Sequence, residues 1–129
     1  MLEFIKAPTG PQRPYSAAVR AGDFIFVSPQ GGRMNHQTNE KITTVAGQTE
    51  HCLTGVESVL KAAGASMADV VTLNILVTKQ EGSDGLNEPI RRAFPGGLPG
   101  RTVVCTELYH PEMLVMIGAI AYHPVEKRP

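Results

Sequence analysis

The stretch Leu114-Val115-Met116-Ile117-Gly118-Ala119-Ile120-Ala121 is apolar at every position and lies near the end of a chain of 129 residues. Such a run is typical of a buried β-strand. Because successive side chains of a strand point to opposite faces of the sheet, both faces here should be buried. Two helices in a chain this short can cover only one face. We therefore expect the other face to meet the same sheet in neighbouring copies, with ligand sites in the clefts between subunits.

Two helices are predicted. The first spans Thr44–Ala63, where apolar residues recur at the three- and four-residue spacing of a helix face. Thr43 or Thr44 can cap its start, and Gly64 suits the left-handed position after its end. The second spans Asp84–Ala93 and is stopped by Pro95-Gly96-Gly97.

The remaining periodic segments predict strands, and residues 29–43 are polar and expected as a loop. The strands are Leu2–Lys6, Ser16–Val19, Phe24–Ser28, Val70–Thr78, Thr102–Leu108 and Met113–Tyr122. Ala21-Gly22-Asp23 forms a hairpin turn. In the fourth strand Val71, Leu73, Ile75 and Val77 are expected on one face. This order predicts an α+β fold over residues 1–129 as one domain, a single sheet with two helices on one face.

Composition narrows the class of function. Lys plus Arg and Asp plus Glu number 12 each, so no basic surface for nucleic acid or membrane is indicated. There is no signal-peptide core and no apolar run long enough to cross a bilayer. Cys52 and Cys105 are expected to be reduced, which favours the cytoplasm. The four histidines show no ligand spacing, so neither a metal nor another cofactor is predicted.

Arg101 stands at the start of an apolar strand, behind the turn Leu98-Pro99-Gly100. The planar guanidinium binds carboxylates through two parallel hydrogen bonds. The residue types leave two partners open, an acid of a neighbouring subunit or the carboxylate of a ligand.

Several segments are similar, in order, to the motifs of one family. Pro14-Tyr15-Ser16-Ala17-Ala18-Val19 is similar to GPYSQAV, and Ala21–Ser28 with Gln30 to G-x-x-I-F-x-S-G-Q. Ala63–Val71 is similar to A-G-x-x-x-x-D-V-V, and Asn87 with Phe94 is similar to N-x-x-Y-x-x-F. Leu98–Arg101 is similar to P-A-R, and Ile117–Ala121 is similar to the end of E-I-E-A-I-A. The chain thus resembles the Rid (YjgF-type) family of reactive-intermediate deaminases, formerly labelled L-PSP endoribonucleases.

The resemblance implies a chorismate-mutase-like subunit that forms a barrel-like homotrimer with sites at the interfaces. It implies hydrolysis of imines and enamines of small 2-oxo acids to the oxo acid and ammonia. Arg101 matches the family arginine that holds the substrate carboxylate. The other positions implied to line the site are Tyr15, Ser28, Asn87, Val103 and Met116. From the residues alone, Tyr15 could equally pack at an interface and Asn87 could lie on a helix surface.

The chain departs from the family at the acid–base group. Met116 stands where the deaminases carry a glutamate that positions or activates water, and Gly118 replaces the second glutamate of the motif. Pro29 replaces the glycine of S-G-Q, so a backbone N–H is lost. Met116, Gly118 and Val103 are expected to make the pocket more apolar and to fit a larger substrate. The loss of the glutamate leaves a first alternative, a catalytically weak ligand-binding protein of the same fold. The former family label leaves a second, an endoribonuclease, which the zero net charge makes less favoured.

Overall fold

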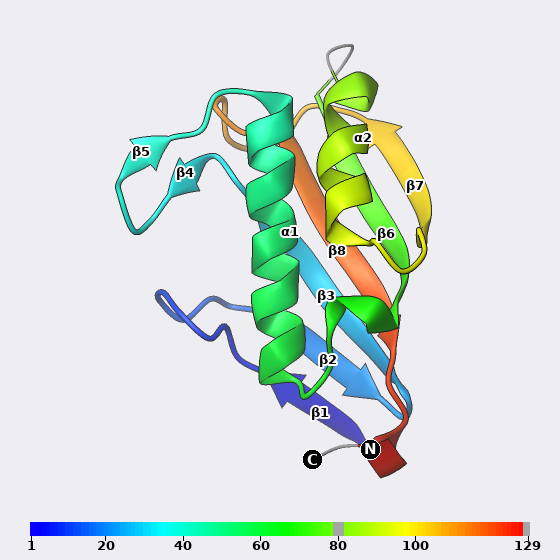
Figure 1. The fold of residues 1–129 in the computed structure, drawn as a ribbon. Helices are drawn as coiled ribbons and strands as arrows, with labels where there is room; N and C mark the ends of the chain where they lie inside the picture. The colour runs from blue at the N-terminus through cyan, green and yellow to red at the C-terminus, as the bar shows by residue number, and fades with distance from the viewer. Residues whose placement is uncertain (79–81, 128–129) are drawn as a thin grey trace.

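The computed structural model describes residues 1–78 and 82–127. Six strands form one mixed sheet in the order β1-β2-β3-β8-β6-β7. Their bounds are Leu2–Ile5, Ala18–Ala21, Phe24–Gly31, Val115–Tyr122, Val70–Val77 and Gly100–Cys105. The helices α1 (Val45–Ala62) and α2 (Gly82–Ala93) lie side by side on one face (Figure 1). The predicted α+β arrangement is therefore confirmed.

The predicted limits of α1 are accurate because its end signals are local. The Thr44 side chain accepts a hydrogen bond from the Gly47 N–H at 3.0 Å, which caps the first turn. Gly64 follows the helix at a φ of +85°, a left-handed conformation that glycine adopts without strain.

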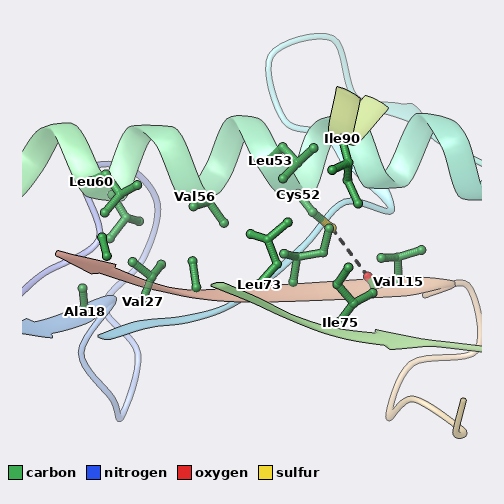
Figure 2. Packing of buried hydrophobic residues seen from close by; sticks show 14 of the residues in the cluster. Ala18, Val27, Cys52, Leu53, Val56, Leu60, Leu73, Ile75, Ile90 and Val115 are labelled. Atoms are coloured by element: carbon green, nitrogen blue, oxygen red, sulfur yellow. Dashed lines mark hydrogen bonds between the residues drawn. The ribbon is translucent and has the colours of Figure 1, made fainter. Parts of the chain in front are cut away.

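The core lies between α1 and the middle of the sheet (Figure 2). Leu53, Val56 and Leu60 point from α1 toward the sheet, where Leu73 and Ile75 of β6 are also buried. Cys52 lies among them, and its thiol donates to the Val115 carbonyl at 3.6 Å. This packing fixes α1 over β3 and β8.

The opposite face of the sheet carries exposed apolar side chains. Phe24 and Phe26 on β3 are paired with Tyr122 and Ile120 on β8. The Phe24 and Tyr122 rings meet edge to face at 5.3 Å, and both remain exposed. Within the described chain the two helices thus cover only one of the two apolar faces.

Several expectations about the strands were wrong in detail, and the strand expected at Ser16–Val19 spans Ala18–Ala21. Residues 29–43 are not all loop: β3 continues to Gly31 through a bulge between Val27 and Gln30, and β4 (Met34–Asn35) pairs with β5 (Glu40–Lys41). The predicted strand Thr102–Leu108 begins at Gly100 and ends at Cys105. Val71 leaves the buried face because the register between β6 and β8 shifts at this point, so its side chain is 48% exposed.

Candidate functional site

Arg101 is the second residue of β7, a strand at the edge of the sheet. It is paired in register with Leu73, whose side chain is buried beneath the helices, so Arg101 points to the helix side of the sheet. The guanidinium is exposed, and it has no hydrogen bond or ion pair to any of residues 1–78 and 82–127. This leaves it available to a neighbouring subunit or a ligand.

Val103 and Asn87 belong to the same margin of the molecule. Val103 lies two residues after Arg101 and is 39% exposed on the same side of β7. Asn87 is half-buried on α2, which lies beside β7 (Figure 1). The burial of Leu86 and Ile90, its neighbours on α2, anchors this helix. These three predicted site residues form a first group.

Tyr15, Ser28 and Met116 are treated as a second group, in which Tyr15 and Ser28 are joined through Ser16 and Met116 lies two strands from β2, on β8. Tyr15 is 59% exposed just before β2. The Ser28 hydroxyl donates to the carbonyl of Ser16, the residue after Tyr15, at 2.8 Å. Met116 is half-buried and pairs with Leu76, on the face of the sheet that the helices leave uncovered.

One chain does not bring the two groups together. From β2, which Tyr15 precedes, to β7 there are four strand spacings, or about 19 Å at about 4.8 Å each, whereas Met116 on β8 is only two spacings from β7, or about 10 Å. Met116 and Arg101 also project from opposite faces of the sheet, because the partner of Arg101 faces the helices and Met116 alternates with buried Val115 and Ile117. Within one chain, Arg101 is therefore separated from Tyr15 by the strand spacing and from Met116 by the sheet itself.

Backbone lies close to Gly118 on the side where a side chain would project. A Cβ at this position would lie 3.0 Å from the Val27 carbonyl oxygen and 3.6 Å from the Pro29 Cα. The bulge of β3 thus fills the space beside Gly118 with backbone. Of the three substitutions expected to reshape the site, Met116 and Val103 carry partly exposed side chains, and Gly118 carries none.

The strongest ion-pair cluster lies elsewhere, where the β4–β5 hairpin meets the residues before β8. Glu112 accepts a hydrogen bond from Lys41 at 2.8 Å and lies 3.6 Å from Arg33. The Lys41 hydrogen bond lowers the pKa of the Glu112 carboxyl, with Lys41, His110 and Arg33 charges adding to the effect. This carboxylate is therefore ionised and occupied by its own neighbours.

Sequence reasoning gave no role to the Gln48 side chain, which is fully buried on α1. Its amide nitrogen donates to the Ile42 and Glu112 carbonyls at 2.7 and 2.9 Å, and its oxygen accepts from the Leu114 N–H at 2.8 Å. It therefore ties the segment before α1 to the segment before Met116. The available signal was a glutamine on the apolar face of a predicted helix.

Other chemistry is limited in the described part of the chain. Burial raises the pKa of the Cys52 thiol to about 12, so it stays protonated and is no nucleophile. No group of three or more His, Cys, Asp or Glu in residues 1–78 and 82–127 is placed to hold a metal. Two surface depressions near residues 33–43 and 107–113 contain none of the six predicted site residues.

Residues 4–123 match the model of the endoribonuclease L-PSP family. The chain belongs to this family, also known as the YjgF or Rid family. The match spans nearly the whole sheet and both helices, so the Rid-type fold is the fold of the entire chain rather than of one segment.

Relatives of known description agree with the Rid assignment. A protein of Dermatophagoides farinae described as 2-iminobutanoate/2-iminopropanoate deaminase is 34% identical over 103 residues, which are 78% of this chain and 80% of that protein. The crystal structure of RidA from the Antarctic bacterium Psychrobacter sp. PAMC 21119 has a TM-score of 0.81 at 26% identity, covering 93% of this chain and 98% of that one. E. coli TdcF with bound serine has a TM-score of 0.80 at 25% identity, covering 94% and 98%.

The described part of the chain contains no helix with the length and apolar character needed to span a membrane.

Proposed function

We propose that this Rid-family protein hydrolyses imines of small 2-oxo acids. The water oxygen bonds to the imine carbon, the carbon–nitrogen bond breaks, and both water protons pass to nitrogen, which leaves as ammonia beside the 2-oxo acid. The observation that carries the proposal is Arg101, a guanidinium with no hydrogen-bond or ion-pair partner among the described residues, in a chain 34% identical to a protein described as an imine deaminase.

Arg101 holds the substrate carboxylate. Its planar fork makes two parallel hydrogen bonds to the two carboxylate oxygens, which fixes the orientation of the adjacent imine carbon. Holding a reactant in this way accounts for part of the acceleration, because it removes the entropy cost of alignment. The serine bound to TdcF supports a ligand of this class, since serine carries a carboxylate next to a nitrogen-bearing carbon.

The full site forms between neighbouring copies of the chain in a homotrimer. One copy supplies Arg101, Val103 and Asn87, and the next supplies Tyr15, the strand end at Ser28 and Met116. The four strand spacings between β2 and β7, about 19 Å, and the opposite faces of the sheet on which Met116 and Arg101 project support this arrangement. The uncovered apolar face, including Phe24, supplies surface for the association. We place this one-domain protein in the cytoplasm.

Catalysis in this protein proceeds without a carboxylate on β8. The thioether of Met116 neither accepts nor gives up a proton, and Gly118 has no side chain. An imine is already electrophilic, so positioning of substrate and water remains effective, but the contribution of a proton-transfer group, about 10²–10⁴-fold, is missing. This observation also favours a second candidate, a carboxylate-binding protein of the same fold with little turnover.

The deciding experiment is competition with semicarbazide. 2-Iminobutanoate is generated in situ, and semicarbazone formation is followed without protein, with this protein and with Arg101→Ala. A deaminase lowers trapping, and Arg101→Ala abolishes the effect. The matched control is Arg92→Ala, which removes an exposed arginine that pairs with Glu50 on the helix surface. Thermal protection by 2-oxobutanoate without turnover would establish the binding protein instead. If the protein shows neither turnover nor thermal protection, both candidates are rejected.

A further inference from the structure

Ser28 has its polar groups committed to its own chain. The hydroxyl donates to the Ser16 carbonyl at 2.8 Å, and the backbone N–H donates to the Ala17 carbonyl at 2.9 Å. Its carbonyl accepts from the Gln30 side chain at 2.9 Å. The hydroxyl proton is therefore used within the fold rather than offered to a ligand.

These bonds anchor the residues next to Tyr15. Ala17 is held from its other side as well, because its N–H donates to the Ile5 carbonyl at 2.8 Å. Tyr15 itself is 59% exposed, and it follows the proline- and glycine-rich residues 8–14, which are largely exposed. The conformation at Tyr15 is consequently set from its C-terminal side.

The Ser28 hydroxyl extends the contact between β3 and the segment before β2. The regular ladder between β2 and β3 ends at the pair Ala18 and Val27. Further along β3, Pro29 has no N–H to donate. Beyond the pair of Ala18 and Val27 the Ser28 N–H still donates to the Ala17 carbonyl, and the Ser28 hydroxyl adds a second hydrogen bond to the segment before β2.

We propose that Ser28 is a positioning residue that fixes Tyr15 for the carboxylate-bearing substrate through its hydrogen bond to the Ser16 carbonyl. This inference rests on the proposed function. It changes the role of Ser28 from a ligand contact to a support for one.

The test compares Ser28→Ala with Ser28→Thr, which keeps a hydroxyl and suits a strand. Loss of one such hydrogen bond predicts a rise of about fivefold in KM for 2-iminobutanoate, with kcat little changed. Ser28→Thr should restore the KM. In a Tyr15→Ala background, Ser28→Ala should raise the KM no further, because the residue through which it acts is gone. Ser58→Ala on α1 is the control for a generic serine replacement.

A local readout separates positioning from general loss of stability. The amides of Ala17 and Ser28 should exchange hydrogen faster in Ser28→Ala, while amides of β8 keep their protection. An unchanged KM in Ser28→Ala, or an equal rise with and without Tyr15, would overturn the positioning role while leaving the deaminase intact.

If the wild-type protein binds 2-oxobutanoate without turnover, the same comparison is made with its Kd. A wild-type protein that neither turns over nor binds rejects the proposed function and this role with it. That failure appears in the wild type, whereas failure of the positioning role appears only in the variants.

Discussion

The Cβ that Gly118 lacks would lie 3.0 Å from the carbonyl oxygen of Val27, across the ladder between β8 and β3. The Pro29 Cα would lie 3.6 Å from the same point. A proline inside a sheet is tolerated at a bulge, and the register of β3 shifts here. Pro29 and Gly118 both depart from the family's motifs, and they lie against each other. The two departures therefore lie at the same place in the sheet, beside the bulge of β3.

Gly118→Ala should lower the free energy of unfolding by about 1–3 kcal/mol, because the added methyl group meets backbone that cannot rotate away. Urea denaturation at a fixed protein concentration measures the change. Gly96→Ala is the control, since a Cβ there meets nothing within 4 Å and the φ is not left-handed. A loss for Gly118→Ala no larger than that for Gly96→Ala would show that β3 yields easily.

Met116→Glu should raise the rate of imine hydrolysis. Met116 stands where the resemblance to the family's deaminases places a water-activating glutamate, so a carboxylate at this position restores the missing proton-transfer group. A proton-transfer group predicts a gain in kcat of up to about 10²–10⁴-fold. The semicarbazide competition measures it.

Met116→Gln separates acid–base chemistry from polarity, because the amide has a similar size and no titratable proton. Equal rates for the Glu and Gln variants would mean that position 116 is not next to the reacting atoms. A gain for Glu alone would support the assignment of Met116 to the site.

Local sequence patterns predicted most of the fold. The helix α1 followed from spacing and caps between Thr44 and Gly64, and the burial of β8 followed from its apolar run. The β4–β5 hairpin was missed because its two-residue strands have no alternation and are held by Lys41 and Glu112, which are 71 positions apart. The end of β7 was missed because Thr106 leaves the strand while its N–H still donates to the Val77 carbonyl of β6.

The candidate site was harder to predict for a different reason. The turn before Arg101 indicates that this arginine lies at the start of a strand. Which residues lie near it depends on the order of the strands in the sheet, which the sequence does not state. The pairing of β7 beside β6 places Arg101 far from Tyr15 in the same chain. The family resemblance named site residues that lie apart within one chain. The close backbone packing at Gly118 could not be predicted from the residue types there.

Gln48→Leu should destabilise the protein by about 2 kcal/mol or more. The leucine fits the volume but leaves the Ile42 and Glu112 carbonyls and the Leu114 N–H without their partner. Urea denaturation again measures the loss, and Gln37→Leu at an exposed position is the control. A change within the error of the control would mean that water replaces all three hydrogen bonds.

Cys52 should make stability fall at alkaline pH. Burial raises its pKa to about 12 in the folded chain, whereas the unfolded thiol titrates near its ordinary value of 9.0. Between these values the unfolded state has lost the proton and the folded state keeps it. The free energy of unfolding therefore decreases as the pH rises, by up to about 1.4 kcal/mol per pH unit from this group.

The measurement compares Cys105→Ser with Cys105→Ser/Cys52→Ala by urea denaturation near pH 8 and near pH 10. Titrating tyrosines and lysines are common to both proteins, so their effect cancels in the difference. The variant that retains Cys52 should lose about 1–2 kcal/mol more over this interval. Its thiol should also resist alkylation near pH 8 until the protein is unfolded, because the reactive thiolate is absent. Equal pH dependence in the two variants, or rapid alkylation of the folded protein, would show that α1 opens and exposes Cys52.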